Sequence, residues 1–396
     1  MKTRILNFDE LLKRKSVFLF GPRQTGKSTW LKSKYPEALY INLLSKKVFD
    51  EYSTKANALE SDLELFHRKS NSPYVIIDEV QKLPHLLDEV HNQIENNKNL
   101  RFILTGSSAR KLKRQGVNLL GGRASWKSMF PLVFPEIASE LKTEKDLTNR
   151  LLRGGLPSIY ESSNPFEDFD DYIQLYLLEE IKAEGQVRNY EAFHRFLLTA
   201  TLSNAKQINF TELGSDAQVP PRTVHDYFQI LEDTLIGFML PAFTATPTRK
   251  AMTSAKFYLF DTGLTNALLG RTELSFGTPE VGDLFEQFII SEVRAYVSYK
   301  NKKVEMMYWR SYSKLEVDLI LKGKKQILAI EIKAKNKHQN KDFNGLLAFA
   351  EDYPKAKKIV VFNEGHHSIE ENKIECIPIF NFLKMLWNDE IISDDF

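Results

Sequence analysis

SVFLFGPRQTGKSTWLKSK, residues 16–34, is the stretch that decides the fold of the amino-terminal part of this chain. Its first five residues form a short apolar run typical of a buried strand, and residues 30–34 have helix-forming composition. Between them, Gly21 and Gly26 let the backbone curl so that its N–H groups face phosphate oxygens, while the following helix adds a favourable dipole. The sequence therefore predicts an α/β domain with a phosphate-binding loop made of Gly21, Pro22, Arg23, Gln24, Thr25, Gly26, Lys27, Ser28 and Thr29.

A second apolar run, residues 74–77, ends in the acidic pair Asp78 and Glu79. Alone, such a pair is usually a solvated strand end, but beside a phosphate-binding loop it fits a magnesium site. Lys27 is expected to hold the β- and γ-phosphates, with Ser28 and Asp78 as metal ligands and Glu79 orienting the attacking water. The predicted ligands are ATP and Mg²⁺.

Two further candidates follow along the chain. Residues 101–104 form another apolar strand that leads into Thr105, Gly106 and Ser107, and a hydroxyl there can sense the γ-phosphate. A polar cap on the next helix explains Ser107 equally well. Arg123 lies in a basic stretch, residues 108–127, and fits both an arginine finger, acting on its own or a neighbour's nucleotide, and a solvated basic surface.

Composition excludes several classes of protein. The chain has 396 residues, enough for two or three domains, and its 54 basic and 52 acidic side chains leave a net charge of only +2. A single cysteine excludes an internal disulfide and fits a reducing cytoplasm. The sequence contains no signal-like run at its start and no stretch long enough for a membrane-spanning helix, so we expect a cytoplasmic protein with no membrane partner.

Several motifs, taken as a set, resemble those of the prokaryotic AAA-type ATPases (AAA_14) that carry a C-terminal DUF4143 region. The motifs are GPRQTGKST, VIIDEVQKLP, FILTGSSA, LLGGRA, LRGGLPSIY and KFYLFDTGLTNALLG, in that order. The resemblance implies an ASCE P-loop ATPase domain, a winged-helix segment and a restriction-endonuclease-like domain. It implies this architecture more firmly than a biological role.

The middle of the chain favours a helical connector. A Gly-Gly-Pro turn lies in residues 153–160, and residues 166–201 are mainly helical in pattern. Residues 208–240 then fit a helix-turn-helix whose second helix starts near Arg222. Arg222 and His225 suit DNA contact, whereas Glu232 and Asp233 suit a protein or interdomain contact better.

Charged residues of the last third follow a helix–strand–strand order. Glu286 lies early in a helical segment, Asp318 in an alternating strand, and Glu331 and Lys333 two residues apart on the next strand. An antiparallel hairpin would bring the last three together as a PD-(D/E)xK pattern, with Glu286, Asp318 and Glu331 as magnesium ligands and Asp318, Glu331 and Lys333 as catalytic groups. The alternative is that these charged residues are simply exposed on the surfaces of ordinary strands. The resemblance to the nuclease-like domain favours the catalytic interpretation. A basic rim at the same edge is expected from Lys322, Lys324, Lys325, Lys333, Lys335, Lys337 and Lys341.

These patterns predict an ATPase domain in residues 1–135, a helical linker and winged helix in 136–275, and a restriction-endonuclease-like α/β domain in 276–396. ATP is then expected to gate magnesium-dependent cleavage of DNA. The alternative is a nucleotide-dependent switch that binds DNA or protein through an inactive nuclease-like domain. Assembly of several copies into a homo-oligomer is compatible with either.

Overall fold

The computed structural model describes residues 2–107, 120–177, 189–244, 255–337, 339–370, 372–393 and 396. These residues form two compact units, which we describe separately. The amino-terminal unit comprises Thr3–Phe130 with Asp233–Leu235, and the carboxy-terminal unit comprises Pro131–Glu232 and Ile236–Phe396 together with Lys2. The division at residue 130 lies near the boundary predicted at 135, whereas the boundary predicted at 275 falls inside the carboxy-terminal unit.

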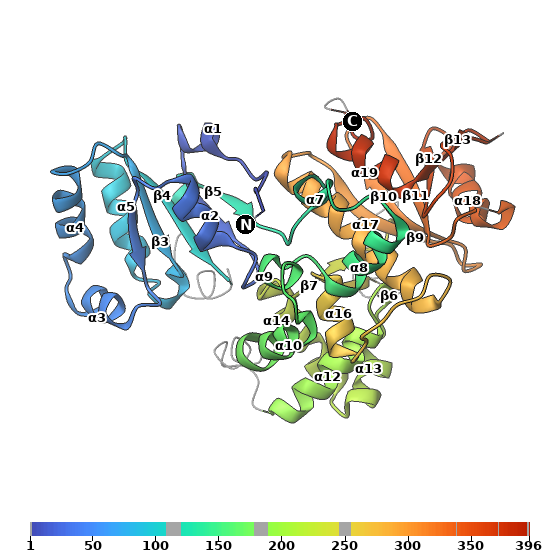
Figure 1. The fold of residues 1–396 in the computed structure, drawn as a ribbon, viewed down its shortest axis with the longest axis horizontal. Helices are drawn as coiled ribbons and strands as arrows, with labels where there is room; N and C mark the ends of the chain where they lie inside the picture. The colour runs from blue at the N-terminus through green and yellow to red at the C-terminus, as the bar shows by residue number, and fades with distance from the viewer. Residues whose placement is uncertain are drawn as a thin grey trace. The chain divides into compact units, whose positions relative to one another are not determined.

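The amino-terminal unit is built on a fully parallel five-stranded sheet, drawn in blue and cyan in Figure 1. The strand order is β2-β3-β4-β1-β5, so β4 lies between the strand that enters the phosphate-binding loop and the strand that ends in the acidic pair. The strands are β1 (Ser16–Phe20), β2 (Leu39–Asn42), β3 (Tyr74–Asp78), β4 (Arg101–Gly106) and β5 (Ala124–Ser128).

Helices cover this sheet because its central strands are apolar on both faces. Phe18, Ile77 and Leu104 point to one face and pack against residues of the helices α3, α4 and α5, while Leu19 and Ile103 are equally buried on the other face. The helical elements are α1 (Asp9–Leu12), α2 (Lys27–Lys34), α3 (Lys46–Thr54), α4 (Ala58–His67), η1 (Val80–Lys82), α5 (Leu86–Asn96) and η2 (Leu120–Gly122).

The first part of the carboxy-terminal unit is mainly helical, and its helices share one aromatic-rich core. A small antiparallel sheet of order β6-β8-β7 joins them. The helices are α7 (Phe134–Ile137), α8 (Glu144–Arg153), α9 (Pro157–Tyr160), α10 (Pro165–Asp171), the π-helical η3 (Tyr172–Leu177), α12 (Tyr190–Leu202), α13 (Phe210–Ala217), α14 (Pro221–Asp233) and α16 (Thr262–Leu268). The strands are β6 (Lys206–Gln207), β7 (Gly237–Leu240) and β8 (Lys256–Leu259).

A mixed six-stranded sheet forms the rest of this unit, in orange and red in Figure 1. Its order is β13-β14-β12-β11-β10-β9, with β9, β10 and β11 antiparallel and β11, β12 and β14 parallel. The strands are β9 (Glu305–Arg310), β10 (Glu316–Lys322), β11 (Ile327–Lys333), β12 (Lys357–Phe362), β13 (Ser368–Ile369) and β14 (Ile374–Pro378). The helices are α17 (Pro279–Tyr299), η4 (Asn340–Phe343), α18 (Asn344–Asp352) and α19 (Ile379–Trp387).

Within the described residues, no helix combines the length and the apolar character needed to cross a bilayer. Cys376 is a buried free thiol in β14.

Candidate functional site

The phosphate-binding loop leaves β1 at the carboxyl edge of the parallel sheet and enters α2 at Lys27. Gly26 has a φ of 87°, in the left-handed region, and a Cβ on Gly21 would lie 2.4 Å from the carbonyl oxygen of Met129. Both glycines are therefore required by the backbone itself. The buried Lys27 ammonium donates to the carbonyl oxygens of Gly21 (2.6 Å) and Pro22 (2.9 Å), so the loop holds its cation at the loop's own centre.

The acidic pair at the end of β3 lies in a polar network. The Asp78 carboxylate accepts hydrogen bonds from the hydroxyl groups of Tyr40 and Thr105, and the Tyr40 hydroxyl also interacts with Ser28. Burial, with the neighbouring Asp78 carboxylate, raises the pKa of Tyr40. A hydroxyl and a carboxylate bridged in this way are the oxygen donors that a hard cation prefers, so Ser28 and Asp78 fit Mg²⁺. Tyr40 was not predicted from the sequence.

Glu79 is buried beside Asp78 and adopts a positive φ of 62°. Its carboxylate accepts from the Gln81 amide at 2.6 Å, and the same amide donates to the Ser107 hydroxyl at 3.1 Å. Ser107 follows β4, so Gln81 connects the ends of two neighbouring strands. The predicted sensor and the predicted water-orienting carboxylate thus share one partner, which the sequence did not single out.

Arg123 lies at the opposite edge of the sheet from the phosphate-binding loop. Its carbonyl oxygen accepts from the backbone N–H of Ser16, at the amino end of β1, and its guanidinium pairs with Glu95 of α5. Because β1 and β5 are parallel, this position is a full strand length from the loop. An arginine finger that acts on the chain's own nucleotide is therefore incompatible with the fold, which leaves a solvated surface or a contact with another copy. The basic residues at 110–114 lie outside the described residues.

The hairpin predicted for the carboxy-terminal candidates is confirmed. Leu319 of β10 pairs with Ile330 of β11, and one step further along this antiparallel register Asp318 lies opposite Glu331 on the same face. Lys333, two residues from Glu331, places its ammonium 2.5 Å from the Glu331 carboxylate and 3.8 Å from that of Asp318. Asp318 also accepts from the backbone N–H of Ile332 at 2.8 Å.

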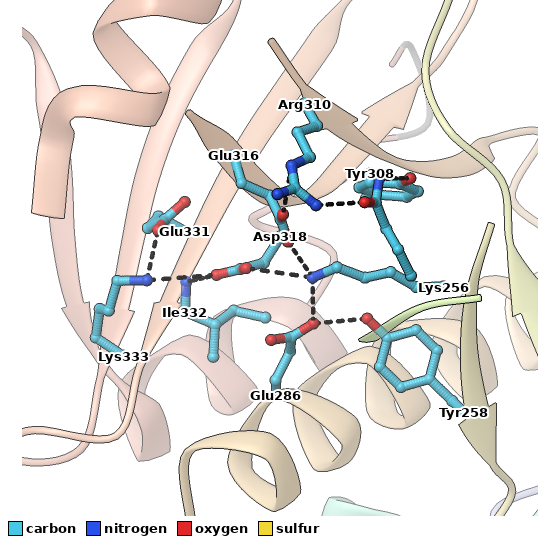
Figure 2. A network of polar contacts seen from close by, with 11 residues as sticks. Lys256, Tyr258, Glu286, Tyr308, Arg310, Glu316, Asp318, Glu331, Ile332 and Lys333 are labelled. Carbon is cyan, nitrogen blue, oxygen red and sulfur yellow. Dashed lines mark hydrogen bonds and ion pairs between the residues drawn. The ribbon is translucent and has the colours of Figure 1, made fainter. Parts of the chain in front are cut away.

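Figure 2 shows a second cation at this centre, the ammonium group of Lys256. Lys256 is only 3% exposed, and its Nζ lies 2.5 Å from Glu316, 2.9 Å from Glu286 and 3.6 Å from Asp318. The Tyr258 hydroxyl donates to the same Glu286 oxygen at 2.6 Å. Lys256 and Tyr258 come from β8, outside the segment in which the site was predicted, and neither they nor Glu316 were singled out from the sequence.

This arrangement corrects the predicted metal set of Glu286, Asp318 and Glu331. In the described parts of the chain, no three acidic, histidine or cysteine side chains converge as a metal site. Glu286 instead binds Lys256 and Tyr258. The remaining pair fits a cation better, because Glu331 is 7% exposed and its Oε2 is buried without a hydrogen-bond partner beside Asp318.

Protonation at this centre follows from burial and from neighbouring charges. Burial raises the pKa of Glu286 to about 7, against the opposing effect of Lys256. Burial and the adjacent Asp318 also raise the pKa of Glu331 well above its ordinary value. The surrounding carboxylates outweigh burial at both cations, so the pKa values of Lys256 and Lys333 are raised and both side chains are charged at neutral pH.

The predicted basic rim is wrong in part. Lys322, Lys324 and Lys325 lie at the turn between β10 and β11, the end of the hairpin away from Asp318 and Glu331. Lys333 lies at the site, and Lys335, which follows it, pairs with Asp342 at 2.7 Å. In α14, Arg222 and His225 are exposed.

Three family models match consecutive segments of the chain. The AAA domain family (AAA_14) matches residues 13–138, and two domains of unknown function, DUF8612 and DUF4143, match residues 144–275 and 281–382. The phosphate-binding loop and Asp78 therefore lie in the AAA-type segment. Of the carboxy-terminal centre, Lys256 lies in the DUF8612 segment and Glu286, Asp318 and Glu331 lie in the DUF4143 segment.

Three relatives with similar sequences are each described as an uncharacterized protein. One from Mycobacterium tuberculosis is 24% identical over 328 residues, covering 80% of this chain and 70% of that protein. One from Haemophilus influenzae is 21% identical, covering 78% and 77%, and one from Methanocaldococcus jannaschii is 20% identical, covering 96% and 91%.

Two solved structures align over part of the chain. The Aeropyrum pernix ORC1 protein in complex with DNA is 14% identical, with a TM-score of 0.24 over 65% of this chain and 86% of that one. Replication initiator DnaA bound to AMPPCP and single-stranded DNA is 12% identical, with a TM-score of 0.29 over 55% and 82%. Scores this low do not establish a shared fold. The match to the AAA family and the geometry of the loop make the amino-terminal unit a P-loop ATPase domain of AAA type.

Proposed function

We propose that the protein is a magnesium-dependent ATPase in which Lys27, Ser28, Asp78 and Glu79 do the chemistry of ATP hydrolysis. The observation that carries this proposal is that the Tyr40 hydroxyl contacts both the Ser28 hydroxyl of the P-loop and the Asp78 carboxylate at the end of β3. The two side chains expected to bind magnesium therefore lie close together. The position of β4 between β1 and β3 supports the ASCE assignment.

In this mechanism the curled backbone between Gly21 and Gly26 binds the phosphates, and Lys27 leaves the Gly21 and Pro22 carbonyls to bind the β- and γ-phosphates. Mg²⁺, held by Ser28 and Asp78, would neutralise charge on the phosphate oxygens. Glu79 accepts a hydrogen bond from the attacking water and orients it. The Gln81 amide donates to one oxygen of that carboxylate, and the other carboxylate oxygen remains as an acceptor for the water.

ATP binding and turnover test this proposal separately. We expect Lys27→Ala to abolish magnesium-dependent ATP binding, and Glu79→Gln to keep binding but lower turnover about 10²-fold or more. Arg14→Ala, which removes a cation from the opposite edge of the sheet, is the matched control. Unchanged affinity in Lys27→Ala, or unchanged turnover in Glu79→Gln, would refute these roles.

We further propose that the carboxy-terminal unit is a metal-dependent DNA nuclease gated by the nucleotide. Support comes from the opposed pair Asp318 and Glu331 with Lys333 between them, and from the buried unpartnered oxygen of Glu331. Two carboxylates directly opposite each other repel, and Lys333 supplies one positive charge while leaving Oε2 of Glu331 unpartnered, so this oxygen is available to a metal cation. The order of α17, β9, β10, β11, α18 and β12 supports a restriction-endonuclease-like core.

Mg²⁺ held by Asp318 and Glu331 would supply an activated water and stabilise charge on a phosphodiester. Lys333 steadies the developing negative charge, since its ammonium already contacts both carboxylates. DNA would approach through the adjacent helices. The sequence of α12, β6, α13, α14, β7 and β8 supports a winged-helix assignment for that segment.

The competing function is a nucleotide-dependent switch that cleaves nothing, favoured by the engagement of Glu286 and Asp318 with Lys256. Plasmid DNA incubated with Mg²⁺ or Mn²⁺, with and without ATP, separates the two. We expect the parent protein to cut, Asp318→Ala to be inactive, and Lys27→Ala to lose the dependence on ATP. A parent protein that hydrolyses ATP but never cuts DNA, alone or as an oligomer, would favour the switch.

A further inference from the structure

We propose that the ammonium group of Lys256 is a permanent cation of the carboxy-terminal centre, so that the centre takes one divalent ion, between Asp318 and Glu331, and not two. The inference rests on the proposed nuclease function, since it concerns the metal content of that centre. It adds Lys256 and Glu316 to the site as positioning residues. It also assigns the role of Glu286, which is to hold the lysine.

The position of Lys256 leaves no room for a second ion. A second magnesium ion would need the oxygens of Glu286, Glu316 and Asp318, and the ammonium already lies 2.9, 2.5 and 3.6 Å from them. The lysine cannot easily withdraw, because its backbone pairs with Leu240 of β7 and with Gln207 of β6. Its side chain is buried and lies over the Tyr308 ring, with 5.5 Å from Nζ to the ring centroid.

Charge balance gives the same answer. With every group ionised, four carboxylates face three cationic side chains, which leaves one negative charge. The groups are Glu286, Glu316, Asp318 and Glu331 with Lys256, Lys333 and Arg310. One divalent ion and one phosphodiester together add one positive charge and balance the centre. A second divalent ion would leave two uncompensated positive charges at a largely buried site, at a high electrostatic cost.

The surroundings hold the arrangement in place from both sides. Arg310 lies 3.8 Å from the second oxygen of Glu316 and also donates to Gln207, while Tyr258 donates to Glu286. Glu286 and Glu316 are therefore oriented toward Lys256 by groups other than Lys256 itself. On the far side of Asp318, the unpartnered Oε2 of Glu331 marks the place left for the divalent ion.

Counting bound Mn²⁺ tests the proposal without relying on activity. Full-length protein carrying Asp78→Asn, which silences the P-loop metal site, is titrated with Mn²⁺ in the absence of nucleotide, and free Mn²⁺ is measured by its electron paramagnetic resonance signal. We expect one ion per chain in this parent, none after Glu331→Gln, and two after Lys256→Met, which frees three carboxylates. Lys322→Met, at the far end of β10, is the matched control and should still bind one.

Two bound ions in the parent, or one ion in a folded Lys256→Met protein, would overturn the proposal. No bound ion in the parent would refute the nuclease centre itself, and the two failures are therefore distinguishable. If Lys256→Met does not fold, as judged by circular dichroism, Lys256→Arg replaces it and should keep a count of one. The order of DNA cleavage in metal, expected to be one for the parent, is the second readout.

Discussion

Removing the buried cation at position 256 should destabilise the carboxy-terminal unit, and the structure allows the size of the effect to be worked out. Lys256→Met leaves Glu286, Glu316 and Asp318 without the ammonium that contacts all three. Breaking a buried ion pair from one side costs about 3–5 kcal/mol, because the remaining charge stays desolvated. Adding Glu286→Gln removes one of those charges while keeping an oxygen for the Tyr258 hydroxyl, so about 1–3 kcal/mol should return as coupling.

The measurement is urea unfolding followed by tryptophan fluorescence. Trp309 and Trp387 report on the carboxy-terminal unit once Trp30 and Trp126 of the other unit have been replaced by phenylalanine. The cost of Lys256→Met should shrink in acid, because the pKa of Glu286, about 7 already, rises further without the lysine and the group takes up a proton. A loss below about 1 kcal/mol at neutral pH, or zero coupling in the cycle, would refute the reasoning. Lys322→Met should leave stability unchanged.

Three other predictions concern packing, turnover and pH. A Cβ on Gly345 would lie 1.9 Å from the carbonyl oxygen of Glu316, so Gly345→Ala should push α18 away from β10. We expect the free energy of unfolding to fall by about 1–3 kcal/mol in the same urea assay. Gly282→Ala is the control, because a Cβ there would meet nothing within 4 Å. Gln81→Leu should leave ATP affinity unchanged but alter the rate of hydrolysis about tenfold or more, because Glu79 and Ser107 lose their common hydrogen-bond partner. An unchanged rate in a steady-state phosphate-release assay would show that the contact has no catalytic role. Burial raises the pKa of Glu292 to about 7 from 4.5, so the folded unit binds a proton that the unfolded chain has released. The stability linked to this group is present below pH 4.5 and is lost as pH rises through 7, by at most about 3 kcal/mol. Glu292→Gln should reduce that loss when the free energy of unfolding is compared at pH 5 and pH 8.

Local patterns predicted the elements that carry the P-loop chemistry. The strand at Ser16–Phe20 has the bounds expected, and β3 extends the expected run by one residue to Asp78. The hairpin of β10 and β11 was also predictable, because the twelve residues between Asp318 and Glu331 are enough for two antiparallel strands and a turn. In each case the residues that form the element lie close together in the sequence, so a local pattern is enough to predict it.

The partners that come from distant parts of the chain could not be predicted. Lys256 meets Asp318 only because β8 packs beside the six-stranded sheet, and the one signal in the sequence is a lysine at the start of the apolar run KFYLF. The placement of Arg123 depends on β5 running parallel to β1, which the motif does not encode. Lys322 is near Asp318 in the sequence, but it lies at the turn end of the antiparallel hairpin, away from Asp318.

The contribution of β8 to the carboxy-terminal centre has a practical consequence for dissecting the protein. The boundary between the DUF8612 and DUF4143 segments, at residues 275–281, suggests a natural place to truncate the gene product. A fragment that starts there would keep Glu286, Glu316 and Asp318 but lose the lysine that neutralises them. Its inactivity or insolubility would not separate the missing counter-charge from a loss of catalytic chemistry, so fragments meant to isolate this chemistry should include the residues of the compact unit from Pro131 onward.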